Sequence, residues 1–208
     1  MHRGKVVLVG HSYVRRLKKY RHQHTGSQWE INEEGISVDL GYVFQGGQDY
    51  EFFNASWHHK ASILQENPDV VLVVLGGNAV ANSVPTPQAA YQMHMFVNWL
   101  KRALPLSVIV IAEVEPRYNW HEGLPADHDP EVESFKTERN NFNQAVRRLR
   151  AKDFTLRVAN CLCSWDYYNY DGVHFNDKGN KFYWEIIINT LKHVIERRFP
   201  TGAVPDRF

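Results

Sequence analysis

Short runs of valine, isoleucine and leucine recur at intervals along this chain, and they constrain its fold more than any other feature. The runs are largely apolar on both faces, unlike a strand that has one side exposed to water. Such runs are typical of parallel β-strands covered by helices on both faces of the sheet. Five of them occur, at Val6–Val9, Ile36–Leu40, Val70–Leu75, Val108–Val114 and Thr155–Ala159.

Helix-like patterns fill the intervals between these runs. Thr86 is suited to cap one helix, with Pro87 at its first position, and Asn176 or Asp177 is suited to cap the last. Strands that alternate with helices predict right-handed βαβ units and a three-layer α/β/α sandwich. The expected helices span Tyr13–Arg21, Asp49–Glu66, Thr86–Ala103, Glu133–Lys152 and Asp177–Arg198.

The length of 208 residues suits one domain with a well-filled core and is short for two. We expect a single domain over residues 1–198. A loosely ordered tail is expected over residues 199–208, which contain two prolines and a glycine. Lysine and arginine number 24 and aspartate and glutamate 23, so the overall charge gives no support to nucleic-acid or membrane binding.

The sequence favours an intracellular protein without a membrane span. The first strand begins by Lys5, which leaves no room for a signal peptide. No apolar stretch reaches the ~20 residues that a membrane-spanning helix needs. Cys161 and Cys163 are separated by one residue, and along a strand such neighbours share a face and seldom bond to each other. We interpret both as free thiols, as expected in a reducing compartment.

Four short polar segments follow the carboxyl ends of predicted strands, where active sites form in open α/β sheets. Each segment alone has a common structural interpretation that involves no function. Gly-x-Ser is commonly a helix cap, Gly-Gly a turn, and Asp-x-x-His a surface feature. Their convergence on one edge of the sheet is far more specific. The segments contain Ser12, Gly46-Gly47, Gly76-Gly77-Asn78, and Asp171 with His174.

These segments resemble the blocks of the SGNH or GDSL hydrolases. The first block of that family is Gly-Asp-Ser, which Gly10-His11-Ser12 matches with histidine in place of aspartate. Gly47, with Gly46 as the alternative, fits the glycine of the second block, and Gly76-Gly77-Asn78-Ala79 matches Gly-x-Asn-Asp except at its last residue. Asp171 and His174 fit the final Asp-x-x-His. The resemblance covers nearly the whole chain and implies the SGNH hydrolase fold, with a flavodoxin-like parallel five-stranded sheet.

The resemblance implies a serine esterase. Ser12 would be the nucleophile, His174 the base that takes its proton, and Asp171 the group that orients the imidazole. The oxyanion hole would consist of the backbone N–H groups of Ser12 and Gly47 and the side-chain amide of Asn78. This chemistry needs no metal and no organic cofactor, and we expect neither.

Two positions depart from the family pattern. The aspartate that His11 replaces is usually not a member of the triad, so the change alters the local charge and the substrate environment without removing a catalytic group. Ala79 lacks a carboxylate that in the family chiefly supports the turn around the asparagine. Neither change removes a group that the implied chemistry needs, and we therefore expect an active enzyme.

Aromatic residues border the predicted serine and suggest the kind of substrate. They lie in two loops, residues 115–132 and 162–170, and are as consistent with core packing as with binding. As a binding wall they would suit sugar rings or other planar groups, which favours short-chain esters such as O-acetyl groups on a small-molecule, sugar or lipid substrate. The candidate substrate-binding residues are His11, Tyr118, Trp120, Trp165 and Tyr170.

The alternative function is nucleic-acid binding. Arginine, lysine and tyrosine are interleaved from Arg15 to His22, as on surfaces that bind single-stranded nucleic acid. Residues 12–17 are also similar to esterase domains of some non-LTR retrotransposons and to invertebrate SGNH-like proteins, and family relatives that lost the triad bind RNA. Because this chain keeps the triad residues, an SGNH-like domain with RNA binding as its main role is the less favoured hypothesis.

Overall fold

The computed structural model describes residues 4–26, 30–33, 36–118, 130–149, 154–156 and 164–198. Six strands form one sheet in the order β2-β3-β1-β4-β5-β6. All neighbouring pairs are parallel except β2 and β3, so five parallel strands carry one antiparallel strand at the edge. The strands are β1 Gly4–Gly10, β2 Glu30–Glu33, β3 Ile36–Phe44, β4 Val70–Val74, β5 Val108–Ala112 and β6 Phe154–Leu156.

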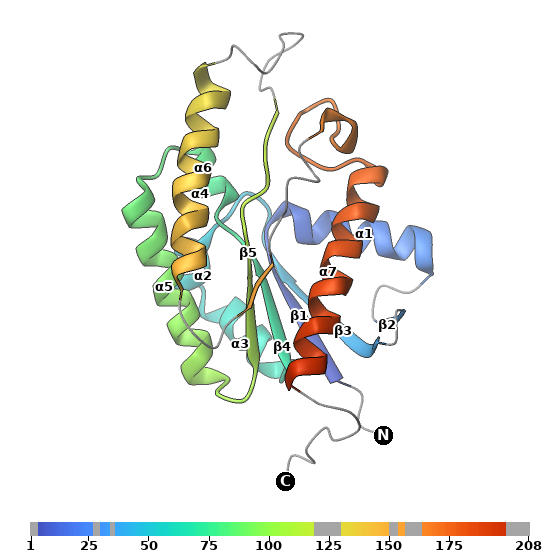
Figure 1. Ribbon diagram of the computed structural model, residues 1–208. Coiled ribbons are helices and arrows are strands. Elements are labelled where there is room, and N and C mark those ends of the chain that lie inside the picture. Colours follow the sequence, from blue (N-terminus) through green and yellow to red (C-terminus); the bar gives the residue numbers. More distant parts are fainter. Residues whose placement is uncertain are drawn as a thin grey trace.

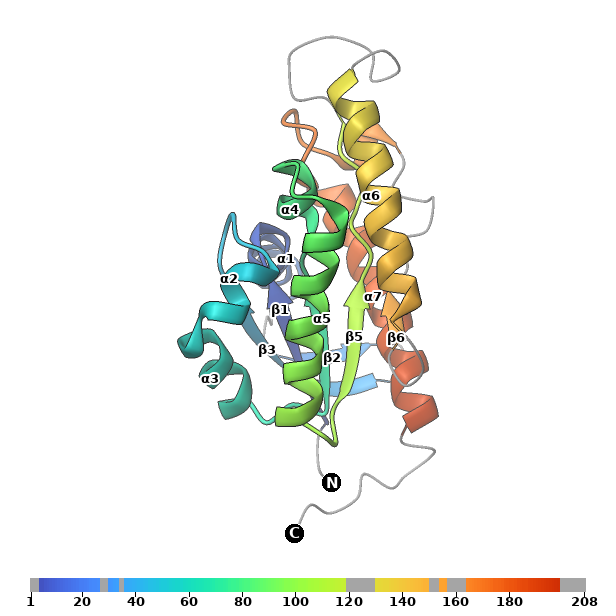
Figure 2. The same cartoon turned by 90° about the vertical axis from the view of Figure 1, so that its left-hand side faces the viewer.

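Helices cover both faces of the sheet, which confirms the predicted three-layer sandwich (Figure 1). Helices α1 and α7 pack on one face, and α2 to α6 pack on the other. Figure 2 shows α5 lying along the sheet between the α2–α3 pair and α6. The helices are α1 Ser12–Thr25, α2 Tyr50–Ala55, α3 Trp57–Gln65, α4 Gly77–Ala81, α5 Thr86–Ala103, α6 Pro130–Arg148 and α7 Asp177–Arg198, with a 3-10 turn η3 over Trp165–Tyr167.

Alternate residues of each central strand enter different hydrophobic cores. Val6 and Leu8 of β1 pack under α1 and α7, whereas Val7 and Val9 pack under the helices of the opposite face. All four side chains are at most 1% exposed. Because both faces of the sheet are buried, the sequence of each central strand is an uninterrupted apolar run. The positions of these strands were therefore predicted correctly from the sequence.

The edge strand β2 was not predicted. Its sequence Glu-Ile-Asn-Glu offers a single apolar side chain, that of Ile31, which is completely buried. Four residues with one apolar position give no recognisable period. The strand is instead defined by its antiparallel pairing with β3, in which Ile31 lies opposite Val38.

The helix predicted over residues 49–66 is two helices. Ser56 ends α2 and begins α3 with an extended backbone (φ −83°, ψ 96°), and its hydroxyl is 2.7 Å from His59 Nδ1. Hydrogen bonds of Ser56 thus compete with a continuous helix at this point. Residues 157–159 of the last predicted strand and the predicted tail over 199–208 lie outside the described residues.

The parallel strands run in the flavodoxin-like order, with the first strand between the second and third. The chain therefore leaves β1 toward one side of the sheet and reaches β4 on the other, and a crevice forms at the carboxyl ends of these two neighbours. Ser12 follows β1 directly, and Asn78 follows β4. The loop after β3, with Gly47, and the loop after β5, with Arg117, lie at the same edge.

Candidate active site

Ser12 is the first residue of α1, two residues beyond the end of β1. The turn is tight because Gly10 has no side chain. A Cβ at position 10 would lie 2.5 Å from both Val14 Cγ2 and the Val74 carbonyl oxygen. The glycine of the Gly-His-Ser segment therefore lets β1 pass close to β4 and turn at once into the helix that carries Ser12.

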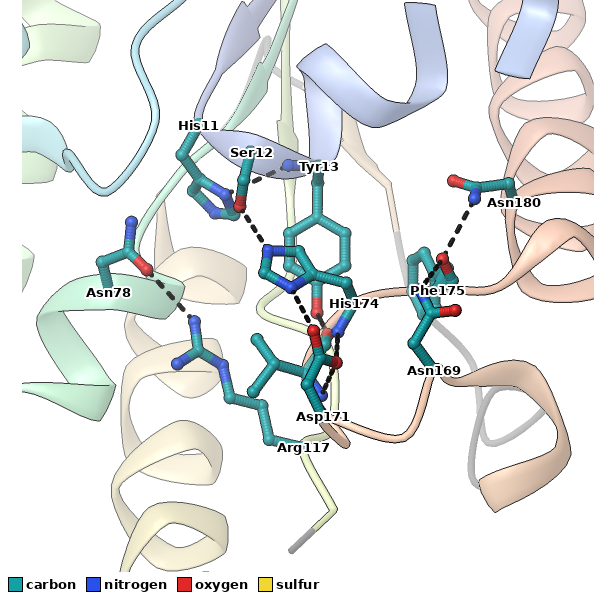
Figure 3. A network of polar contacts seen from close by, with 11 residues as sticks. His11, Ser12, Tyr13, Asn78, Arg117, Asn169, Asp171, His174, Phe175 and Asn180 are labelled. Atoms are coloured by element: carbon teal, nitrogen blue, oxygen red, sulfur yellow. Dashed lines mark hydrogen bonds and ion pairs between the residues drawn. The ribbon is translucent and has the colours of Figure 1, made fainter. Parts of the chain in front are cut away.

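Ser12, His174 and Asp171 form a continuous chain of hydrogen bonds (Figure 3). Ser12 Oγ is 2.9 Å from His174 Nε2, and His174 Nδ1 is 2.8 Å from Asp171 Oδ2. A carboxylate only accepts hydrogen bonds, so Nδ1 carries the imidazole proton and Nε2 is left to accept that of the serine. This is the geometry in which a histidine acts as a general base toward a serine.

The segment that carries Asp171 and His174 is held by backbone hydrogen bonds. Asp171 Oδ1 accepts the N–H groups of Val173 and His174, both at 2.9 Å, so the carboxylate is fixed in direction. The Asn169 N–H donates to the His174 carbonyl at 2.7 Å. The Tyr13 hydroxyl donates to the Val173 carbonyl, which ties this segment to the start of α1.

Burial keeps His174 neutral, and hydrogen bonds keep Asp171 ionised. Burial lowers the pKa of His174 below its usual 6.5, and the cations Arg16 and Arg117 lower it further, while Asp171 opposes them. Burial alone would raise the pKa of Asp171, but its hydrogen bonds from His174 and Val173 outweigh this, and the pKa lies below 3.8. The base is therefore unprotonated at neutral pH.

Asn78 lies in the first turn of α4, where it joins the loops after three strands. Its Nδ2 donates to the Gln48 carbonyl at 3.0 Å, and its Oδ1 accepts from Arg117 Nη2 at 3.2 Å. Gly76 precedes this turn at φ +103°, and a Cβ there would lie 2.6 Å from Phe142 Cε1. Gly47, at φ +74°, lies directly before Gln48, so Asn78 is attached to the loop that carries this predicted oxyanion donor.

His11 is 1% exposed, so the expectation that it contacts substrate does not fit its position. Its Nδ1 accepts the Tyr13 N–H at 3.5 Å, which makes it the cap of α1. Burial, with smaller contributions from Arg117 and His174, lowers the pKa of His11 to about 3, so the ring is neutral. The histidine that replaces the family's aspartate therefore brings no charge to the site.

The aromatic candidates divide between packing and exposure. Tyr118 is half-buried, and its ring lies 4.9 Å from that of Tyr168 and 6.2 Å from that of Trp165. Trp165 is 46% exposed and Tyr170 95% exposed, and both belong to the segment that leads into Asp171. Trp120 lies outside the described residues.

Two residues of the site escaped the sequence interpretation, Arg117 and Tyr13. Arg117 follows β5 and is 7% exposed, yet it reaches Asn78 (Figure 3). Tyr13 is 3% exposed and forms part of the core beneath the triad. The position of Arg117 after a predicted strand was a usable signal, because the loop after β5 shares the edge with the other three loops.

Among the helices that the structure describes, none is long and apolar enough to cross a bilayer. Within the same residues, no three histidine, cysteine, aspartate or glutamate side chains are grouped as a metal site would require. No observation addresses the nucleic-acid alternative, which stays a prediction.

Several solved structures share this fold at low sequence identity. A psychrotrophic esterase from Pseudoalteromonas sp. superposes with a TM-score of 0.63 at 14% identity, covering 93% of this chain and 99% of that one. An acetyl xylan esterase gives 0.64 at 14% identity, covering 89% and 98%. A carbohydrate esterase of family 3 from Talaromyces cellulolyticus gives 0.60 at 19% identity, covering 93% and 99%.

No curated protein sequence matches this chain. The model of the GDSL-like lipase/acylhydrolase family, in contrast, matches residues 7–182, which include every segment of the site described above. The chain therefore belongs to the GDSL-like lipase/acylhydrolase family and is a carboxylic ester hydrolase.

Proposed function

We propose that this protein hydrolyses short-chain carboxylic esters, O-acetyl esters among them, by a Ser12–His174–Asp171 triad. The observation that carries the proposal is the unbroken hydrogen-bond chain from Ser12 Oγ through the imidazole to the Asp171 carboxylate. Neutral His174 takes the serine proton as Oγ attacks the ester carbonyl, and the resulting imidazolium gives a proton to the leaving alcohol. Water then hydrolyses the acyl-enzyme by the same steps in reverse.

The oxyanion of the tetrahedral intermediate would be bound by the backbone N–H groups of Ser12 and Gly47 and by Asn78 Nδ2. Arg117 supports this role for Asn78, because a guanidinium has only donors and so fixes Oδ1 as the atom that faces it. The amide nitrogen is thereby turned toward the loop with Gly47, where one of its two hydrogens reaches the Gln48 carbonyl. A donor of this kind contributes ~3–4 kcal/mol to transition-state stabilisation.

The exposed aromatic side chains of Trp165 and Tyr170, and the Tyr118 ring 6.2 Å from that of Trp165, support a substrate that has a flat ring. Two of the structural neighbours are an acetyl xylan esterase and a carbohydrate esterase. An O-acetylated sugar is thus the substrate class that the aromatic wall favours.

The test is hydrolysis of p-nitrophenyl esters from acetate to octanoate, combined with inactivation by a fluorophosphonate. We expect the highest kcat/KM for the short acyl chains. One phosphonyl group should be bound per chain, with the mass shift confined to the peptide that contains Ser12. Failure to hydrolyse any of these esters, together with the absence of labelling at Ser12, would refute the proposal.

The pH dependence of kcat/KM should show an acid limb whose midpoint lies below pH 6.5. The reaction needs neutral His174, and a pKa below the usual value keeps the imidazole neutral to lower pH. Arg16→Gln removes a nearby cation that lowers this pKa, so the limb should move to higher pH. Arg15→Gln on the same helix is the charge-matched control and should leave the limb unmoved, and an equal shift in both variants would contradict this assignment.

A further inference from the structure

A groove of about 570 Å³ lies between α1 and the segment that runs from η3 into α7. Arg16, Lys19 and Gln23 line one wall, and Asp166, Asn169 and Lys178 line the other. Residues 12, 16, 19 and 23 follow one another at helical spacing, so the wall formed by α1 continues the face that carries Ser12. With a rise of 1.5 Å per residue, Gln23 lies roughly 16 Å along the helix from Ser12.

The groove is lined by acidic and basic side chains. The two acidic residues each lie near a basic side chain, whereas two of the basic residues form no ion pair in the part of the chain that the structure describes. Asp166 lies 3.8 Å from Lys178, and Asp177, also in the groove, lies 3.8 Å from His24. Within the described residues, Arg16 and Lys19 form no ion pair, and Arg16 Nε is buried without a hydrogen-bond partner. Two like charges one helical turn apart disfavour the helix, so the pair of cations does not stabilise α1.

Arg16 also opposes the proposed reaction. Ester cleavage converts neutral His174 into an imidazolium, and the Arg16 cation disfavours that positive charge. A negative charge bound beside Arg16 would offset this unfavourable interaction when the substrate is in place. A substrate that carries a negative charge of its own would supply this anion and so favour formation of the imidazolium.

We propose that the groove binds a negatively charged group of the ester substrate, a phosphate, sulfate or carboxylate, between Arg16 and Lys19. The inference rests on the proposed function, because it assigns a substrate class to the same site. Arg16 and Lys19 lie roughly 6 and 10 Å along α1 from Ser12, which sets the distance between the anionic group and the reacting carbonyl. The groove is thus the site that selects anionic esters.

Two matched pairs of esters test the proposal and distinguish the source of the anion. An acyl-side anion is probed by 4-nitrophenyl hydrogen adipate against 4-nitrophenyl hexanoate, and an alcohol-side anion by 4-acetoxybenzenesulfonate against 4-acetoxybenzenesulfonamide, a neutral ester whose leaving phenol carries a similarly electron-withdrawing group. We expect at least one anionic ester to have a kcat/KM about tenfold above its neutral partner, as charge-assisted hydrogen bonds would give. The preference should fall as salt screens the exposed Lys19.

Lys19→Gln should remove most of that preference while leaving turnover of the neutral esters unchanged. Lys18→Gln is the matched control, because Lys18 is on the same helix but lies 5.5 Å from the Tyr42 ring and 5.8 Å from that of Phe44, outside the groove. The proposal is overturned if neither anionic ester is preferred, or if both lysine variants lower the preference equally. Turnover of 4-nitrophenyl hexanoate reports on the proposed esterase function independently of either result.

Discussion

Replacement of Ser12 by alanine is expected to abolish ester hydrolysis while the protein stays folded. Ser12 Oγ is the only atom in the hydrogen-bond chain that is placed to attack a carbonyl, and alanine removes it without altering the imidazole or the carboxylate. Loss of such a nucleophile lowers kcat by about 10⁶-fold in a triad hydrolase. Alanine is the strongest helix former, so α1 should be preserved. The measurements are kcat/KM with p-nitrophenyl acetate and the thermal unfolding midpoint.

Ser62→Ala provides a matched control for this result. Ser62 lies on α3, and its hydroxyl donates to the His58 carbonyl in the exposed part of that helix, away from the triad. Its substitution should leave turnover and fluorophosphonate labelling unchanged. If Ser12→Ala retained wild-type turnover, the nucleophile would have to be sought elsewhere, even though the family and the fold would stand.

The sequence was sufficient to predict those elements that are buried along a continuous run of apolar residues. Strands such as β1 and β4 are apolar on both faces and pack against helices on both. Their positions were therefore predictable from the local runs of apolar residues. The convergence of Ser12, Asn78 and His174 on one edge followed from the topology of a parallel sheet. In contrast, β2 has one apolar residue and depends on pairing with β3, which no local pattern reveals.

The contacts around the triad were not predictable in the same way. His11 is buried among residues that meet only in the folded chain, since the Tyr13 ring lies 5.1 Å from its own and a Cβ at Gly77 would lie 3.6 Å from its Nε2. Arg117 reaches Asn78 from a loop 39 residues away, a relation that exists only after the chain folds. The sequence therefore predicted that Asn78 and the triad residues lie at one edge of the sheet, whereas the contacts that Arg117 and Tyr13 make with the site came from the structure.

Asp171→Asn is expected to lower kcat by about 10⁴-fold without destabilising the fold. Val173 and His174 both donate backbone N–H groups to Asp171 Oδ1, so an asparagine would keep its oxygen at that position. Its amide nitrogen would then replace Oδ2 and donate to His174 Nδ1, which must become an acceptor. The imidazole proton moves to Nε2, where it faces Ser12 Oγ, and the base is in the wrong tautomer.

The same backbone contacts make the stability of this variant informative. Because the oxygen still accepts both N–H groups, the unfolding midpoint should match the wild type, whereas Asp171→Ala should lower it by leaving those donors without their acceptor. Asp166→Asn, an exposed position in the same segment, is the control and should retain full turnover. If Asp171→Asn hydrolysed p-nitrophenyl acetate at the wild-type rate, orientation of His174 by the carboxylate would be excluded, because the tautomer would then not limit the reaction.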